Sequence, residues 1–315
     1  MDVDHVLLVG FGGPTHPDEI QPFLEQVTRG HRLPAARLED VAHHYHRVGG
    51  RSRYNEYTLA LAQQLAQCLQ QAEIHRPVFV GLRNWHPFLE DTLRHIHAQG
   101  LRRGLGVILA PHRCDSSYER YLRDVDQARQ RAGAQAITYR YLASWHDHPL
   151  FIRAQADAVA DTLDRVPARA QAHLLFTAHA IPTDMAGAAV YVEQVADSSQ
   201  AVARRLGWSS WSVAYQSRSG DPRQPWLEPE VSAAIQTLAQ RQCPQVVIVP
   251  IGFFCDNVEV VYDLDVEAQA AAAAAGVGYS RAPTVAGQAA FTQMFAQMIG
   301  ETLSGVLRRC SRRVS

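Results

Sequence analysis

Residues 245–254 read Gln-Val-Val-Ile-Val-Pro-Ile-Gly-Phe-Phe, and this nearly unbroken apolar run decides the fold class. A strand with one wet face alternates apolar and polar residues, whereas a strand covered on both faces is apolar throughout. Parallel sheets with helices on both sides bury their strands in this way. A helical pattern follows the run, from Val258 to about Ala275. The stretch therefore predicts one strand–helix unit of an α/β protein.

The same alternation of buried strands and amphipathic helices runs along the whole chain and starts again near residues 143–150. It predicts two consecutive α/β units with parallel sheets, over residues 1–145 and 146–285. The segment 286–315 contains a last helix, at about 287–307, which we expect to pack back on the N-terminal unit. The other strands are expected at 5–12, 77–83, 106–111, 137–142, 172–182 and 211–217. The other helices are expected at 17–26, 58–71, 87–99, 116–132, 150–163, 191–206 and 231–241.

Composition excludes several classes of protein. The chain has 315 residues, 47% hydrophobic and 19% charged, which excludes a disordered chain. Thirty basic and 31 acidic residues give a net charge of −1, so we expect no nucleic-acid partner. Every basic residue is arginine, which excludes a lysine Schiff base and a P-loop lysine. No apolar stretch approaches the ~18 residues of a membrane span, so we expect no integral membrane contact.

The five cysteines are scattered and form no Cys-x-x-Cys pair. This pattern argues against a disulfide framework, a zinc ribbon and an ordinary iron–sulfur motif. The N-terminal residues have no cationic region before a short apolar run, which argues against a signal peptide. We therefore expect a cytoplasmic protein without a [2Fe–2S] cluster. The cysteines are Cys68, Cys114, Cys243, Cys255 and Cys310.

Ligands of open α/β sheets bind beyond the carboxyl ends of the strands, where the first candidate is the turn Gly10–Pro14. A dinucleotide fingerprint needs a third glycine where Thr15 stands, and Pro14 has no amide hydrogen for a phosphate. The turn either brings the backbone close to a flat ligand or only redirects the chain.

The second candidate is His179, at the end of the apolar strand 172–182. Histidine suits proton transfer near neutral pH and binds first-row metals, although a hydrogen-bonded structural role is the plain alternative. The third candidate is the acidic series Glu259, Asp263 and Glu267. On an α-helix their i, i+4, i+8 spacing forms one stripe about 12 Å long. Such a stripe is either a solvated face or a path for a hard divalent cation.

Three other clusters carry weaker signals. His43, His44 and His46 beside Tyr45 lack a clean ligand spacing and fit a solvated helix face. Residues 144–149 fit a structural turn at the unit junction, and residues 216–227 could form one wall of a cleft for a planar ligand.

Several motifs in register resemble those of the ferrochelatase family, and the resemblance covers essentially the whole chain. It is strongest to the ferrochelatases of Gram-positive bacteria, including the actinobacterial type, that act on coproporphyrin III. The motifs are Gly12-Gly13-Pro14, Val48-Gly49-Gly50 with Ser52, Gly81–Phe88, Ala178-His179-Ala180-Ile181-Pro182, Tyr215–Gly220, Pro225-Trp226-Leu227, Val249–Phe253 and Asp256-x-x-Glu259-Val-x-Tyr262-Asp263-Leu264-Asp265.

The resemblance implies two Rossmann-like domains with a porphyrin cleft between them. It implies that His179 and Glu259 are the catalytic pair at the metal-insertion site, with Asp263 and Glu267 as outer metal ligands. The porphyrin-binding residues that it implies are Phe11, Arg29, Tyr45, Ser52, Asn84, Trp85 and Trp226.

The expected activity is insertion of Fe²⁺ into a porphyrin in haem biosynthesis, with coproporphyrin III converted to coprohaem III. Protoporphyrin IX is the alternative substrate. A porphyrin- or haem-binding protein without catalysis and a chelatase for cobalt or nickel are the rival functions. We expect a monomer that needs no cofactor beyond its substrate Fe²⁺.

Three positions depart from the family's pattern. Phe11 stands where some members have a tyrosine that can bind iron, and Asn257 stands where many have histidine. Ala188-Ala189-Val190-Tyr191 replaces Gly-Asp-Pro-Tyr. Because His179 and Glu259 are both present, we expect activity.

Overall fold

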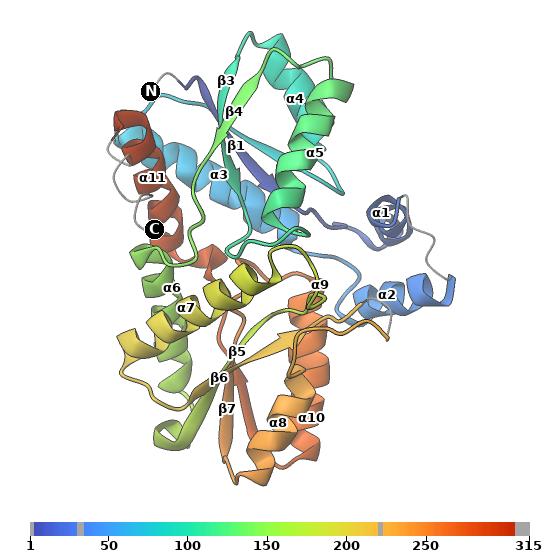
Figure 1. The fold of residues 1–315 in the computed structure, drawn as a ribbon, viewed down its shortest axis with the longest axis vertical. Coiled ribbons are helices and arrows are strands. Elements are labelled where there is room, and N and C mark those ends of the chain that lie inside the picture. Colours follow the sequence, from blue (N-terminus) through green and yellow to red (C-terminus); the bar gives the residue numbers. More distant parts are fainter. Residues whose placement is uncertain (1–2, 30–34, 220–222, 306–315) are drawn as a thin grey trace.

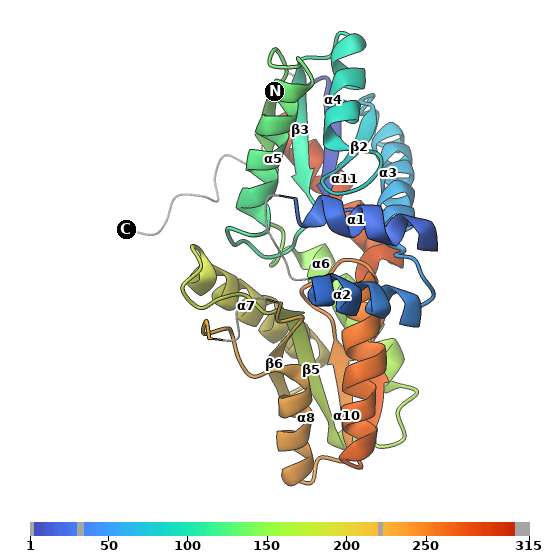
Figure 2. The same cartoon turned by 90° about the vertical axis from the view of Figure 1, so that its right-hand side faces the viewer.

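The computed structural model describes residues 3–29, 35–219 and 223–305. It has two lobes, each built around a four-stranded parallel sheet (Figures 1 and 2). The strand orders are β2-β1-β3-β4 and β6-β5-β7-β8, and every neighbouring pair is parallel. The predicted α/β class with two parallel sheets is confirmed. The strands are β1 (His5–Gly10), β2 (Val78–Leu82), β3 (Arg103–Ile108), β4 (Thr138–Tyr141), β5 (Ala172–His179), β6 (Trp211–Gln216), β7 (Gln245–Val249) and β8 (Gly278–Arg281).

Helices cover the faces of the sheets. Every residue of β1 and β7 is buried, which is why these strands read as continuous apolar runs. The first sheet carries α3 (Tyr54–Gln71), α4 (Leu89–Ala98) and α5 (Tyr118–Arg131). The second carries α6 (Pro149–Leu163), α7 (Ala188–Leu206), α8 (Val231–Gln240) and α10 (Gln269–Ala274). The short 3-10 helices are η1 (Pro17–Glu19), η2 (Arg169–Gln171) and η4 (Val285–Gly287).

Both sheets reverse their strand order at an equivalent point. In the first sheet the chain goes from β1 to β2 and then crosses to β3 on the other side of β1. In the second sheet β5, β6 and β7 repeat this step. A crevice opens at the carboxyl ends of two strands whose connections leave in opposite directions. The loops after β1, β3, β5 and β7 are therefore where a ligand is expected.

Two helices flank the junction of the lobes. They are α1 (Ile20–Val27) and α2 (Ala35–Arg47), and they lie beside it in Figure 1. Their buried side chains form a small core that packs on Phe11 and Trp85 of the first lobe. The core consists of Ile20, Phe23, Leu24 and Tyr45. On the other side, the ring of His44 in α2 stacks on Tyr262 of the second lobe at a centroid distance of 3.7 Å.

Three local features differ from the sequence expectation. The strand expected at 245–254 ends at Val249, since Pro250 has no amide hydrogen and the Ile251 amide bonds back to the Val249 carbonyl at 2.7 Å. The edge strand β8 was not expected, because Gly278–Arg281 is short and half-buried. The helix expected at 258–275 consists of α9 (Val258–Val260), the π-helix η3 (Val261–Ala268) and α10.

The last helix, α11 (Ala289–Ser304), contacts both lobes. Its Thr292 hydroxyl donates to Oε1 of Gln64 in α3 at 3.0 Å. The rings of Phe291 and Phe295 pack on Trp145, each with a centroid distance of 5.5 Å. It also packs on α6. The boundaries 1–145, 146–285 and 286–315 stay a prediction. Within the described ranges, every helix is too short or too polar to cross a lipid bilayer.

Candidate active site between the two sheets

A cavity of about 280 Å³ lies where the carboxyl ends of the two sheets face each other. Much of its lining comes from the loops after β1, β3, β5 and β7, as the strand order predicts, and the helices α2, α3, α5 and α7 supply one tyrosine each. Most of these side chains are apolar or aromatic, which suits a large flat ligand. The lining residues are Phe11, Gly12, Tyr45, Ser52, Tyr54, Leu109, Ala110, Pro111, His112, Cys114, Ser116, Ser117, Tyr121, His179, Ile181, Tyr191, Gly252, Phe253, Phe254, Cys255, Asn257, Val258 and Glu259.

His179 and Glu259 face each other in this cavity. His179 ends β5 and Glu259 lies in α9, and the distance from Nε2 to Oε1 is 3.7 Å. The two side chains are 33% and 39% exposed, so solvent or a ligand reaches both. Nδ1 of His179 donates to the carbonyl of Ala180 at 2.5 Å. That bond turns Nε2 toward the carboxylate, which is the orientation a metal ligand or proton acceptor needs.

The pair is charged at neutral pH. Burial lowers the pKa of His179, but the Glu259 carboxylate and the Ala180 carbonyl outweigh it and raise this pKa to about 9. Burial raises the pKa of Glu259, but the facing imidazolium and a hydrogen bond from Asn257 bring it below its usual range. An imidazolium cannot bind a metal, so a cation that takes Nε2 displaces one proton.

The backbone around His179 is held from three sides. The Tyr191 hydroxyl of α7 donates to the His179 carbonyl at 2.9 Å. The Ala180 amide donates to the Gln216 carbonyl at 2.7 Å, and the Gly252 amide donates to the Thr177 carbonyl at 3.0 Å. Residue 252 must be glycine here, because a β-carbon would lie 2.7 Å from the Cα of Ala178. These contacts fix the imidazole at the floor of the cavity.

Asn257 begins the helix that carries Glu259. Its Oδ1 accepts a hydrogen bond from the Val260 amide at 2.9 Å, the contact of a helix N-cap. Its side chain also donates to Glu259 and lowers the pKa of that carboxyl. Asparagine at this departure from the family's pattern therefore has a positive role, in capping α9 and in holding the carboxylate.

Asp263 and Glu267 continue the acidic series beyond Glu259, along η3. Asp263 accepts hydrogen bonds from the Ser217 hydroxyl and, at 3.4 Å, from Nε2 of Gln216. Burial, with help from Glu259 and Glu267, raises its pKa to about 7. Glu267 is exposed, and burial and Glu230 raise its pKa. Asp263 and Glu267 lie in the π-helix η3, whose i→i+5 hydrogen bonds change the spacing that an α-helix would give these two side chains.

Within the described residues, no three His, Cys, Asp or Glu side chains come close enough to hold a metal ion together. His179 and Glu259 therefore offer two protein ligands, fewer than the four of a closed structural site. Such a pair suits a metal that passes through the site and takes its remaining ligands from water or from a bound molecule.

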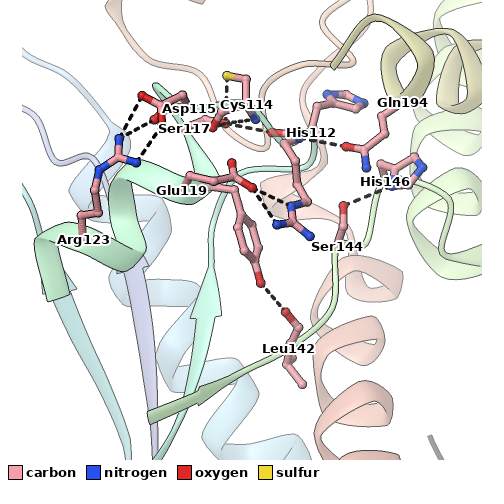
Figure 3. A network of polar contacts seen from close by, with 12 residues as sticks. His112, Cys114, Asp115, Ser117, Glu119, Arg123, Leu142, Ser144, His146 and Gln194 are labelled. Atoms are coloured by element: carbon pink, nitrogen blue, oxygen red, sulfur yellow. Dashed lines mark hydrogen bonds and ion pairs between the residues drawn. The ribbon is translucent and has the colours of Figure 1, made fainter. Parts of the chain in front are cut away.

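The opposite wall of the cavity is a loop held by a polar network. Figure 3 shows the segment from His112 to Ser117 and the contacts that fix it. The Ser117 hydroxyl donates to the His112 carbonyl at 3.0 Å, and the Arg113 amide donates to Oε1 of Gln194 in α7 at 2.8 Å. Asp115 is bound by both Nη atoms of Arg123. The wall is thus tied to both lobes.

His112 is a buried histidine on this wall. Its Nε2 lies 3.0 Å from the Ser198 hydroxyl, which itself donates to carbonyls. Nε2 therefore carries the hydrogen and Nδ1 is an acceptor. Burial, together with His146, lowers the pKa of His112 to about 3. This imidazole is neutral at physiological pH, in contrast to His179.

The residues expected to bind porphyrin fall into two groups. Phe11, Tyr45 and Ser52 line the cavity. Asn84 and Trp85 lie behind its wall. The backbone N–H of Asn84 donates to the Phe11 carbonyl at 2.9 Å, and Nε1 of Trp85 donates to Glu19 at 2.9 Å.

Neither Arg29 nor Trp226 belongs to the cavity lining. The Arg29 side chain is exposed just beyond α1. Trp226 pairs with Pro182 in an isolated antiparallel bridge, and its Nε1 is buried without a partner among the described residues.

Sequence reasoning did not name several lining residues. His112, Cys114, Ser116 and Ser117 follow β3, and the strand-end rule does point to this loop. Tyr121 and Tyr191 reach the cavity from the helices α5 and α7, and although Tyr191 belongs to the stretch 188–191 that departs from the family's pattern, its sequence position gave it no role in the site. A helical tyrosine pattern does not say which sheet end it faces, so only the tertiary structure identifies them.

Comparison with known proteins identifies the family to which the chain belongs. The ferrochelatase family model matches residues 4–303. A coproporphyrin III ferrochelatase from Mycobacterium avium (strain 104) is 41% identical over 310 residues, 97% of this chain and 90% of its own. One from Nocardia farcinica (strain IFM 10152) is 38% identical over 322 residues, 98% of this chain and 91% of its own.

Among solved structures, SirB from Bacillus subtilis with Fe³⁺ has a TM-score of 0.61 at 13% identity and covers 98% of both chains. That similarity concerns the fold alone. The family match and the sequence relatives extend over nearly the whole chain. The chain belongs to the ferrochelatase family, the metal chelatases of haem biosynthesis whose substrates are a porphyrin and iron.

Proposed function

We propose that this chelatase inserts Fe²⁺ into coproporphyrin III to give coprohaem III, with His179 and Glu259 as its catalytic pair. The observation that carries the proposal is the pair itself, 3.7 Å apart in a cavity between two sheets. The porphyrin identity draws on relatives at 38–41% identity that are named coproporphyrin III ferrochelatases.

The chemistry requires water to leave Fe²⁺ and two protons to leave the pyrrole nitrogens. The ionised Glu259 carboxylate is the base that is ready at neutral pH, since the pKa of Glu259 lies below its usual range. His179 must first give up its own proton, which passes to solvent when a metal binds at Nε2. Once the metal has moved into the ring, Nε2 is free to accept the second pyrrole proton. A cavity that favours a bent ring lowers the barrier further, because a distorted macrocycle exposes its nitrogens to the metal.

The other proposed roles follow the position of each residue. Asp263 and Glu267 guide iron toward the pair along η3. Phe11, Tyr45 and Ser52 contact the macrocycle from the lining, and Asn84 and Trp85 support that wall. Arg29 and Trp226 contact a larger ligand at the margins of the cavity, where a porphyrin side chain extends beyond the lining.

We further propose a cytoplasmic monomer that needs no cofactor beyond the substrate iron. The described cysteines, Cys68, Cys114, Cys243 and Cys255, are free thiols, as in proteins of reducing compartments. Fe²⁺ enters and leaves the reaction in the same oxidation state, so the chemistry itself uses no redox partner.

The test is an anaerobic insertion assay with Fe²⁺ that compares coproporphyrin III with protoporphyrin IX and uses His179→Ala as control. We expect faster turnover of coproporphyrin III and loss of turnover in the variant. Faster turnover of protoporphyrin IX would overturn the substrate assignment. Tight porphyrin binding without turnover would make the protein a carrier.

A further inference from the structure

Arg281, at the end of β8, binds two carboxylates of the segment that carries Glu259. Its Nε and Nη2 atoms donate to the two oxygens of Asp265 at 2.6 and 2.8 Å. Its Nη1 and Nη2 atoms lie 3.2 and 3.3 Å from the oxygens of Asp256. The arginine side chain is only 14% exposed, so these charge-assisted bonds are shielded from water.

The two aspartates stand on either side of the catalytic carboxylate. Asp256 precedes α9, Asp265 lies within η3, and Glu259 lies between them. Nine steps of straight helix would separate the ends by about 13 Å, farther than one guanidinium reaches. The chain before α9 must therefore fold back along the helix, and Arg281 closes this fold.

Further contacts hold the same segment from both sides. On the Arg281 side, the Thr284 hydroxyl donates to Asp256 at 2.9 Å, and the Tyr279 hydroxyl donates to the Leu264 carbonyl at 2.5 Å. On the other side, Ser217 and Gln216 at the end of β6 bond to Asp263. A π-helix is rare in proteins, and this one is braced between β6 and β8.

Arg281 also divides the charges of the segment. Residues 256–267 contain five carboxylates. Arg281 pairs with Asp256 and Asp265, whereas Glu259, Asp263 and Glu267 form no arginine ion pair in the part of the chain that the structure describes. The carboxyl groups that a cation could meet without an arginine beside them are therefore these three.

We propose that Arg281 is a positioning residue for metal insertion, because its bridge between Asp256 and Asp265 holds Glu259 and Asp263 in place at the cavity. Arg281 is absent from the cavity lining, so it acts through the segment that it holds. The inference rests on the proposed function of Glu259 and Asp263. Residues that orient metal ligands in this indirect way typically contribute roughly 10–100-fold to metal affinity or activity.

The test compares Arg281→Gln with Arg281→Lys and with Arg94→Gln. Arg94 is a matched control, since it also bonds to two carboxylates, Glu90 and Asp91, at 2.8 and 2.7 Å, but on the outer helix α4. Three quantities are measured: anaerobic turnover at varied Fe²⁺, porphyrin Kd by fluorescence, and Tm.

We expect Arg281→Gln to lower kcat/KM for Fe²⁺ by about tenfold or more, with porphyrin Kd and folding preserved. Arg281→Lys should recover part of the loss because it keeps the charge, and Arg94→Gln should match the wild type. Unchanged kcat/KM in Arg281→Gln, or a loss of porphyrin binding and Tm in the same proportion, would overturn the positioning role.

Calorimetry of Fe²⁺ binding without porphyrin separates this inference from the proposed function. If the wild type bound Fe²⁺ without inserting it, the proposed function would be refuted. The role of Arg281 could still be tested by comparing Fe²⁺ binding of the variant and the wild type. Weaker Fe²⁺ binding in Arg281→Gln than in the wild type would then support the positioning role, and equal binding would refute it.

Discussion

Nε2 of His179 lies 3.7 Å from Oε1 of Glu259, and the two residues are brought together by the pairing of β5 with β7. The loop after β7 crosses the end of β5 at Gly252, and Asn257 then starts the helix that carries the carboxylate. The distance is too long for a strong hydrogen bond and leaves room for a bound cation. The pair is therefore arranged for exchange with a ligand.

Replacing either partner should abolish metal insertion. His179→Ala removes the imidazole, and Glu259→Gln removes the ionised base while it keeps the shape of the side chain. We expect turnover to fall about 100-fold or more, with porphyrin Kd within a few-fold of the wild type. Rates and porphyrin fluorescence measure both effects. His173→Ala, at the opposite end of β5, is the histidine control, and normal turnover in either site variant would refute the assignment.

Asp263→Asn should change how stability depends on pH. The folded-state pKa of Asp263 is about 7, against about 3.9 in an unfolded chain. Between these values the folded protein binds more protons than the unfolded chain, so stability falls as pH rises. Neutral asparagine removes this loss.

We expect the variant to gain about 2 kcal/mol on the wild type between pH 4 and pH 8, after allowance for solvent screening at this half-buried site. Denaturant unfolding at several pH values measures the difference. If the difference in free energy of unfolding between the variant and the wild type stayed constant with pH, Asp263 would already be ionised in the folded protein near pH 4.

Two substitutions should separate the two roles of Asn257. Asn257→Asp keeps an N-cap oxygen for the Val260 amide but loses the donor to Glu259, whereas Asn257→Ala loses both. We expect alanine to cost about 1 kcal/mol of stability and aspartate to cost little. Both variants should lose insertion rate, because the Glu259 carboxylate is no longer held. Chemical denaturation and turnover are the two readouts, and full activity in Asn257→Asp would contradict the donor role.

Gly252→Ala should damage the site by steric conflict alone. A β-carbon at residue 252 would lie 2.7 Å from the Cα of Ala178, next to His179. The loop after β7 must then move away from β5, at a cost of about 1–3 kcal/mol. We expect a lower Tm and a larger loss of insertion than of porphyrin binding.

Gly287→Ala is the matched control, since its β-carbon would meet no atom within 4 Å. Wild-type Tm and turnover in Gly252→Ala would show that this loop relaxes freely.

Sequence alone determined the two parallel sheets and the candidates His179 and Glu259. Continuous apolar runs such as residues 246–249 report burial on both faces, and the strand-end rule selects the residues that follow them. These are local signals, because burial periodicity is written into consecutive residues. The resemblance to ferrochelatases added the roles of the two residues.

Only the tertiary structure decided which side chains meet. Tyr191 reaches the cavity from α7 and bonds to the His179 carbonyl, and Arg281 reaches Asp256 and Asp265 from an edge strand. It also decided that residues 261–268 form a π-helix where the spacing predicted an α-helix. The reason is physical: contacts between distant segments depend on how sheets and helices pack, and that packing overrides local periodicity.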